Sequence, residues 1–351
     1  MGTNNIIKYI VYRLLLIIPT AAILFIVSFF LARLMSGDIA ATVYAGQQVP
    51  PEVLDLWREE NGFNEPILAQ FWNTLQGYFQ GDFGDSYVVY KDVSVLEILS
   101  YSIPRTIELV FIPTIIVPIL GVKLGVLSAK HKNKSVDILI RGLAVLGVCF
   151  PVYWIGLGLQ YLLGAKLRVF TGGEYAMSVF GYKTVGFDDP TYRTGFRIID
   201  CILSNDMVLM WDTIFHLILP VTCMIIISLA GLTRITRSSM LDVLEQDYIR
   251  TARAKGCHEK SVIYKHALRN AMIPTSTMIV MNIAGSIAGS FLIEITFTYR
   301  AMGYAFVQSM LTRDYYLIQA CIMMVGIILL LGYVVADVLY TIIDPRISYK
   351  T

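Results

Sequence analysis

Residues 247–274, DYIRTARAKGCHEKSVIYKHALRNAMIP, form a basic segment in an otherwise apolar chain. Residues 247–255 lack Gly and Pro and favour a helix, and Gly256 is its expected end. A second helix is predicted from about His258, with one basic and one apolar face. Two short helices broken at a glycine can dock into a groove on a partner protein. A loop lying on anionic lipid would carry the same charges, so periodicity leaves both interpretations open.

The composition around this segment is that of an integral membrane protein. Of 351 residues, 56% are hydrophobic and only 15% are charged, whereas a soluble domain is roughly half apolar and about a quarter charged. The five cysteines form no C-x-x-C pair. This spacing favours free thiols over a disulfide framework or a zinc site.

Six apolar runs are long enough to cross a bilayer, which takes about 20 residues. We predict spans at about 9–35, 104–129, 136–165, 213–236, 271–297 and 317–343, within one membrane domain over residues 1–351. The first run is too long for the apolar part of a signal peptide and is expected to remain as an uncleaved span. Prolines inside the runs predict kinks; they are Pro19, Pro113, Pro118, Pro151 and Pro220.

The segments that connect these runs fall into two sets with opposite charge balance. The first set holds 16 Lys and Arg against six acids. It consists of both termini, the 130–134 turn, Asp137 and Arg141 in the third run, and the 234–270 segment. Residues 36–103, 166–212 and 298–316 hold 9 Lys and Arg against 17 acids. The positive-inside rule therefore predicts cytoplasmic termini, a cytoplasmic 237–270 loop, and extracytoplasmic loops at 36–103 and 166–212. Aromatic residues in the outer loops fit either an interfacial belt or the docking of a soluble partner.

Motifs for covalent chemistry and metal binding are absent from the sequence. No G-x-x-x-x-G-K-[ST], H-E-x-x-H or G-x-S-x-G occurs, and the four histidines show no metal-ligand spacing. We therefore expect no catalytic residue, no metal site and no nucleic-acid partner. The chain is better explained as part of a path through the membrane, driven by energy from outside the chain.

The fifth apolar run concentrates small and polar residues that can line such a path. The candidates are Ser276, Asn282, Ser286, Ser290 and Glu294. Small residues also permit close helix packing, and the sequence does not decide between the two roles. The ionisable residues of the apolar runs also have two interpretations: they line a water-filled interior, or they lie near the membrane surface or pair with each other. These residues are Glu108, Lys123, Glu294 and Asp337.

The segments YIRTARAKG and HALRNAMIP closely resemble the EAA loop of ABC importer permeases, in the form found in the dipeptide/oligopeptide group. Similar segments cover nearly the whole chain: GFNEPILAQFWNTLQGYFQGDFGDSY (62–87), SIPRTIELV (102–110), HLILPV (216–221), EITFTYRAMGYAF (294–306), TRDYYLIQA (312–320) and DPRI (344–347). Arg250, Thr251 and Ala252 stand at the general Glu-Ala-Ala triplet, of which only Ala252 is kept, and this difference resembles the peptide permease group. Two features depart from that group's usual pattern: Arg300 and Ala301 stand where a Pro-Gly turn is usual, and the 168–212 loop is longer than in typical members.

This resemblance implies an all-α, polytopic type I ABC importer permease with six transmembrane helices, in the inner membrane of a prokaryotic cell and surrounded by membrane lipid. It implies a second homologous permease subunit, an extracytoplasmic solute-binding protein and two cytoplasmic ATPase subunits. ATP and Mg would bind those ATPase subunits, so no cofactor is expected in this chain. The implied cargo is oligopeptides or dipeptides, and the same machinery could import oligosaccharides, nickel or opines. An ion-coupled secondary carrier is the alternative from another class.

The resemblance also implies which residues couple the permease to an ATPase. They belong to the 237–270 loop and are Asp247, Tyr248, Arg250, Thr251, Ala252, Arg253, Ala254, Lys255, Gly256 and His266.

Overall fold

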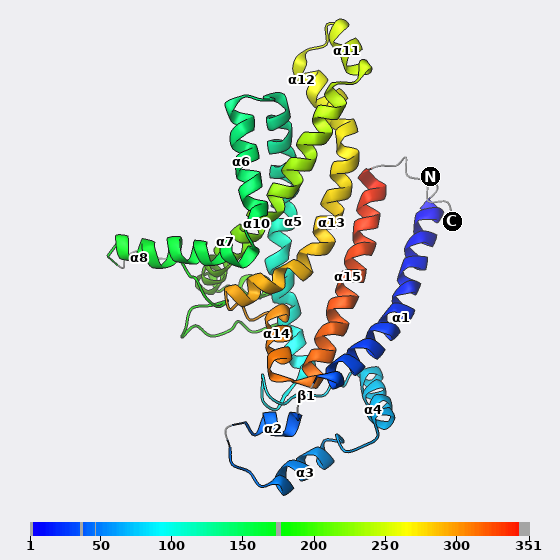
Figure 1. The fold of residues 1–351 in the computed structure, drawn as a ribbon, viewed down its shortest axis with the longest axis vertical. Helices are drawn as coiled ribbons and strands as arrows, with labels where there is room; N and C mark the ends of the chain where they lie inside the picture. Colours follow the sequence, from blue (N-terminus) through cyan, green and yellow to red (C-terminus); the bar gives the residue numbers. More distant parts are fainter. Residues whose placement is uncertain (1–2, 36–37, 46, 173–176, 344–351) are drawn as a thin grey trace.

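The computed structural model describes residues 3–35, 38–45, 47–172 and 177–343, which are almost entirely helical (Figure 1). The strands in these ranges are β1 (Asp85–Ser86) and β2 (Val93–Ser94), one short antiparallel pair. The predicted all-α fold is therefore confirmed. In chain order the helices are α1 (Thr3–Leu34), α2 (Ile39–Val43), α3 (Pro51–Glu60), α4 (Ile67–Gln80), α5 (Val95–Lys130), α6 (Ser135–Cys149), α7 (Val152–Leu159), the π-helix η1 (Gln160–Lys166), α8 (Leu167–Phe170), α9 (Arg197–Leu203), α10 (Met207–Leu244), α11 (Asp247–Ala254), α12 (Glu259–Ser261), the π-helix η2 (Val262–Ala267), α13 (Leu268–Thr296), α14 (Met302–Thr312) and α15 (Tyr315–Ile343).

Four helices in the described part of the chain are long and apolar enough to cross a membrane by themselves: α1, α5, α10 and α15. Two further stretches reach this length only across a bend, α6 with the helix after it and the run from Glu259 through α13. The structure thus has four candidate spans, or six if each bent pair is one span. α5 and α10 have 36 and 38 residues, roughly 55 Å each, so both extend past the predicted spans at both ends.

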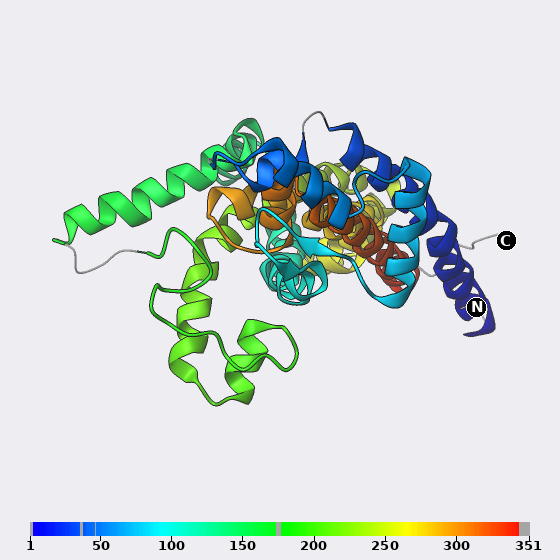
Figure 2. The ribbon, with the colours of Figure 1, turned by 90° about the horizontal axis from the view of Figure 1, so that it is seen from below.

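The third predicted span, 136–165, is bent instead of straight. α6 ends at Cys149, and the following helix leaves it at 106°. The cause is Pro151, which has no N–H to donate and disfavours helical geometry in the residue before it. Phe150 is accordingly extended, with φ −90° and ψ 134°. The segment formed by α7, η1 and α8 therefore projects sideways from the bundle in both views (Figures 1 and 2). The other four prolines remain inside continuous helices.

The centre of the bundle is the contact between α5 and α10. Gly121 and Gly125 lie one turn apart on α5 and bring its backbone close to α10. A Cβ on Gly121 would lie 2.7 Å from Leu232 Cδ2, and one on Gly125 would lie 2.5 Å from Thr236 Cβ. Small residues at a helix contact let two membrane helices approach this closely. The contact therefore fixes the direction of α10, which leads into the 247–274 segment.

Short helices gather at the opposite end of the bundle from α11 (Figure 1). There α4 lies against the end of α1, where Phe25 makes edge contacts with Phe71 and Tyr78 at centroid distances of 5.4 and 5.1 Å. The Asp314 carboxylate, just before α15, accepts a hydrogen bond from the Ser86 hydroxyl at 2.6 Å. The 36–103 segment, predicted as a loop, is thus largely folded and attached to two of the long helices.

Candidate functional site

α11 stands at the end of the bundle, beyond α5, α6 and α13 (Figure 1). Its inner face carries Ile249 and Ala252, both buried. They belong to an apolar cluster with Val126 and Ala129 of α5, Met240 of α10, and Val262, Ile263, Ala267 and Ala271 of the segment that follows. α11 therefore shares one apolar cluster with α5, α10 and the segment that follows it, and this cluster orients α11 relative to the bundle.

The outer face of α11 is charged and exposed. Asp247 and Arg250 form an ion pair at 3.3 Å with side chains that are 94% and 72% exposed. Arg253 reaches across the next turn and donates a hydrogen bond to Glu259 at 2.9 Å. Among the residues expected to couple to an ATPase, Ala252 is buried and His266 is half-buried; the exposed ones are Asp247, Tyr248, Arg250, Thr251, Arg253, Ala254, Lys255 and Gly256. Their contacts with an ATPase remain a prediction.

Gly256 ends α11 in the left-handed conformation, with φ +76°. Its N–H donates to the carbonyl of Arg253 at 2.9 Å, and the N–H of Cys257 donates to the carbonyl of Ala252 at 3.2 Å, as in helices that end at a glycine. A Cβ at position 256 would meet no atom within 4 Å. A larger residue is therefore opposed by the backbone conformation alone, and the expected order of helix, glycine and helix is present.

Two polar contacts hold α10 just before it leads into α11, and the sequence predicted neither. Lys132, in the turn between α5 and α6, donates to Glu245 at 3.0 Å. The buried Asp137 carboxylate on α6 accepts two hydrogen bonds from Arg237 on α10, at 2.7 and 2.9 Å. A bidentate pair sets orientation as well as distance, so α6 and α10 are joined below α11. The available signal was Asp137 itself, an acid at the start of an apolar run.

All five residues expected to line a solute path lie on α13, but their environments differ. Ser276 and Ser290 are buried, and each hydroxyl donates to a carbonyl of its own helix. Asn282 and Ser286 instead line a crevice of about 10 Å³ between α5, α10 and α13. The side-chain nitrogen of Asn282 is buried and has no hydrogen-bond partner among the described residues. The hydroxyl of Ser286 donates to the carbonyl of Asn282, and the role of these two residues in a solute path remains a prediction.

Glu294, the fifth candidate, is fully buried. Its carboxylate accepts hydrogen bonds from the Thr106 hydroxyl at 2.9 Å, the Ser290 hydroxyl at 3.0 Å and the Tyr304 N–H at 3.0 Å. These bonds join α5, α13 and α14 across the turn that replaces the family's Pro-Gly pair. Ala301 is extended there, with φ −119° and ψ −167°, a conformation that needs no glycine. Glu294 thus holds this turn together, and its role in a path remains a prediction.

Two family models together match nearly the whole chain. Residues 6–110 match the "Binding-prot-dependent transport system membrane comp, N-term" model, and residues 121–349 match the "Binding-protein-dependent transport system inner membrane component" model. The chain belongs to this permease family. The expected class, the polytopic permease of an ABC importer in the inner membrane, is confirmed.

Three relatives are similar to the permease over nearly their full length. The oligopeptide transport system permease protein AppB of Bacillus subtilis (strain 168) is 36% identical over 342 residues, covering 97% of this chain and 99% of its own. The dipeptide transport system permease protein DppB of Alkalihalophilus pseudofirmus is also 36% identical, over 345 residues, with the same coverage. The glutathione transport system permease protein GsiC of Salmonella typhimurium is 34% identical over 343 residues, covering 98% and 99%.

A second polar network, which the sequence did not predict, attaches the 177–200 segment of the permease to the end opposite α11. Arg105 on α5 donates to the hydroxyl of Tyr192 in this segment at 2.9 Å and to the carbonyl of Arg300 at 3.1 Å. Arg197, 1% exposed, pairs with Asp189 in the loop before it. Glu108 on α5 accepts a hydrogen bond from the N–H of Ile198, at the start of α9, at 2.9 Å. Lys123 is exposed on α5, and the side chain of Asp337 lies outside the described residues.

Proposed function

We propose that the permease forms half of the transmembrane path for dipeptides or oligopeptides that an extracytoplasmic binding protein delivers, and that α11 docks on a cytoplasmic ATPase subunit. A second, homologous permease would complete the path. Two ATPase subunits would bind ATP and Mg and supply the energy. The cargo class rests on the oligopeptide, dipeptide and glutathione named for the relatives.

The observation that carries this proposal is the two-sided character of α11. Its apolar side, with Ile249 and Ala252, is buried against the bundle, and its charged side is exposed at the end of the molecule. A short helix of fixed orientation suits recognition in a groove on a partner. Gly256 supports the same interpretation, because a loop bound only by lipid charge would not require a defined turn.

The proposed orientation places α11, the turn between α5 and α6 and both termini in the cytoplasm, and α2–α4 and the 177–200 segment outside. We expect single cysteines at Lys132 and Lys260 to react with a membrane-impermeant thiol reagent only in inside-out vesicles. Cysteines at the exposed Phe79 and Val185, which are 85% and 99% exposed, should react in right-side-out vesicles. The background lacks the five native cysteines. Reaction of Lys260→Cys in intact cells would contradict the orientation.

Transport by the reconstituted complex tests the function itself. The permease, its partner permease, the ATPase subunits and the binding protein are placed in liposomes, and uptake of a labelled dipeptide, a pentapeptide, an oligosaccharide, an opine and Ni²⁺ is measured. We expect peptide uptake that requires both ATP and the binding protein. Uptake by the permease alone under an ion gradient would establish a secondary carrier. ATP-driven uptake of Ni²⁺, an opine or an oligosaccharide without any peptide would replace the proposed cargo.

A further inference from the structure

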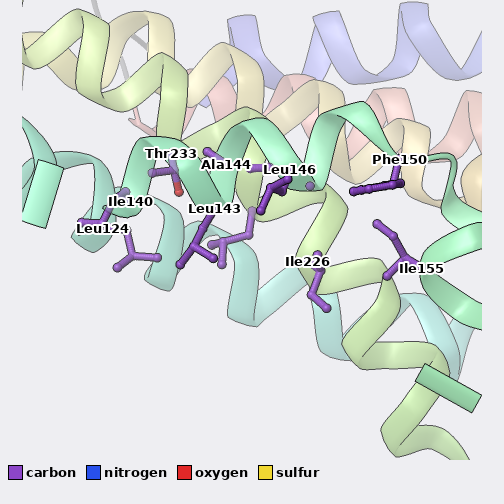
Figure 3. A pocket seen from close by; sticks show the side chains of 12 residues that line it. Leu124, Ile140, Leu143, Ala144, Leu146, Phe150, Ile155, Ile226 and Thr233 are labelled. Atoms are coloured by element: carbon purple, nitrogen blue, oxygen red, sulfur yellow. The ribbon is translucent and has the colours of Figure 1, made fainter. Parts of the chain in front are cut away.

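A hollow of about 240 Å³ lies between α6 and α10 near the end that carries α11. Its α6 wall is formed by Arg141, Ala144, Val145, Val148 and Cys149, and its α10 wall includes Arg234 and Arg237. A second hollow of about 430 Å³ lies against the same helix contact and is lined almost only by apolar side chains, among them Leu143, Leu146 and Ile226 (Figure 3). The two hollows share Ile140, Ala144 and Thr233.

Charge in the smaller hollow is unbalanced. Three guanidinium groups line it, and the carboxylate that faces them is Asp137. Arg237 is committed to this carboxylate by two hydrogen bonds, whereas Arg141 approaches it only at 3.5 Å and its side chain is 47% exposed. Arg234 is exposed and makes no hydrogen bond or ion pair with another described residue. The charges of Arg141 and Arg234 are therefore not neutralised by a carboxylate of their own among the described residues.

The position of these arginines makes an anionic ligand favourable. Arg141 lies six residues inside α6, roughly 9 Å from its first residue, and Arg234 lies ten residues before the end of α10, at the α11 end of the predicted 213–236 span. Both charges therefore stand where a membrane helix nears the membrane surface, at the level of the lipid headgroups, and a charge there favours an anionic partner. On the side of Arg141 facing away from α11, the wall continues as Val145, Val148 and Cys149. The hollow thus combines a cationic end with an apolar length.

We propose that this hollow binds an anionic phospholipid, with its phosphate on Arg141 and Arg234 and one acyl chain along the α6–α10 contact. A soluble anion would leave the apolar wall unused, and a zwitterionic lipid would bring its own positive charge to the arginines. Basic pockets between membrane helices recognise anionic headgroups in this way. The lipid would support the contact between α6 and α10 directly below α11. The proposal does not depend on the cargo of the permease.

The test compares lipids on the assembled, purified transporter. Phosphatidylglycerol and phosphatidylcholine with identical acyl chains are titrated onto the complex, and retained lipid is counted by native mass spectrometry. We expect phosphatidylglycerol to be retained preferentially. The double variant Arg141→Gln/Arg234→Gln should weaken this retention by about tenfold or more, the loss of a charge-assisted contact. The matched control is Lys134→Gln, which removes an exposed charge at the same end of the bundle but outside the hollow, and which should leave retention unchanged.

Two further variants separate binding from misfolding. Arg234→Lys keeps the charge and should keep the preference for phosphatidylglycerol. Val145→Trp leaves the arginines in place but fills the apolar wall, and should lower retention as the double variant does. Equal retention by the double variant and the wild type would overturn the proposal. Competition by glycerol phosphate as strong as that by the lipid would show an anion site without an acyl chain. A cross-link from Cys149 to the second permease would show that protein covers the hollow, and either result would overturn the proposal too.

Discussion

The 247–274 segment and the opposite end of the permease use charged residues in opposite ways. Within the 247–274 segment, at the α11 end, the ion pairs join residues close in sequence, Asp247 with Arg250 and Arg253 with Glu259, and their side chains stay exposed. The buried pair of Asp137 and Arg237 lies outside this segment, between α6 and α10. At the other end, Arg197 and Glu294 are buried, and Glu294 bonds to Thr106 across 188 residues of sequence. Exposed local pairs contribute little to stability, whereas buried polar networks are strongly destabilised when one member is removed. The first end should therefore govern assembly, and the second should govern folding.

The largest effect on stability is expected from Glu294→Ala. It leaves the Thr106 hydroxyl and the Tyr304 N–H without their acceptor, whereas the Ser290 hydroxyl keeps the carbonyl of Ile287. This loss should lower the free energy of unfolding by roughly 2–4 kcal/mol. Thermal unfolding of the purified complex measures this change. The matched control is Glu97→Ala, an exposed glutamate of α5, with an expected change of about 0.5 kcal/mol or less. If the two variants unfold at the same temperature, the outer network does not hold the fold.

The largest effect on assembly is expected from Gly256→Val. A β-branched residue at φ +76° should shift the turn after α11, because the left-handed conformation disfavours a Cβ by roughly 1–2 kcal/mol. The permease should still insert, while co-purification of the ATPase subunits and their hydrolysis stimulated by the binding protein fall sharply. Gly142→Val, on an open face of α6, is the control.

The same measurement distinguishes shape from charge at this end. Lys260→Gln combined with Lys265→Gln should weaken assembly less than Gly256→Val does. The reverse order, with a normal Gly256→Val and no assembly in the double lysine variant, would mean that surface charge holds the loop and that no groove receives α11.

A smaller effect, confined to solute uptake, is expected from substitutions on α13, the helix that joins the two ends. Tryptophan at Asn282 and Ser286 fills the crevice between α5, α10 and α13, so solute uptake should stop while the complex assembles and hydrolyses ATP. Met281→Trp, at a position 63% exposed on the same helix, should transport normally. Normal uptake with both crevice positions filled would remove them from the path.

The smallest effect concerns the pH dependence of the outer loop. Burial by itself raises the pKa of Asp189. The hydrogen bond from Lys183 and the charges of Arg197, Lys183 and Arg105 lower this pKa by more than burial raises it, so the folded-state pKa lies below its usual range. The contribution of Asp189 to stability is thus complete above the unfolded-state pKa of about 3.9 and is lost as pH falls through the lower folded-state value. Asp189→Asn should lower the unfolding temperature of the complex at pH 7, and this difference should shrink below about pH 4. A difference at pH 3 as large as that at pH 7 would exclude this charge pairing.

Several features of the permease follow from the sequence because they depend on neighbours within one or two helical turns. Apolar run length predicted the long helices, and Gly256 predicted the break after α11. The apolar spacing of Val262, Ile263 and Ala267 predicted the face that is buried against the bundle. The kink expected at Pro151 is local too, and only its size, 106°, was missed.

Other features depended on the tertiary structure because their partners lie far apart in sequence. Asp137 could be seen as an acid in an apolar run, but its bond to Arg237, 100 residues away, exists because α6 and α10 pack together. Glu294 was equally visible, but its bonds to Thr106 and Tyr304 exist because α5 and α14 pack beside α13. Periodicity determines which face of a helix is buried. Only the packing of all the helices determines what that face meets, because a buried polar group takes whichever donors or acceptors the fold brings within hydrogen-bonding distance.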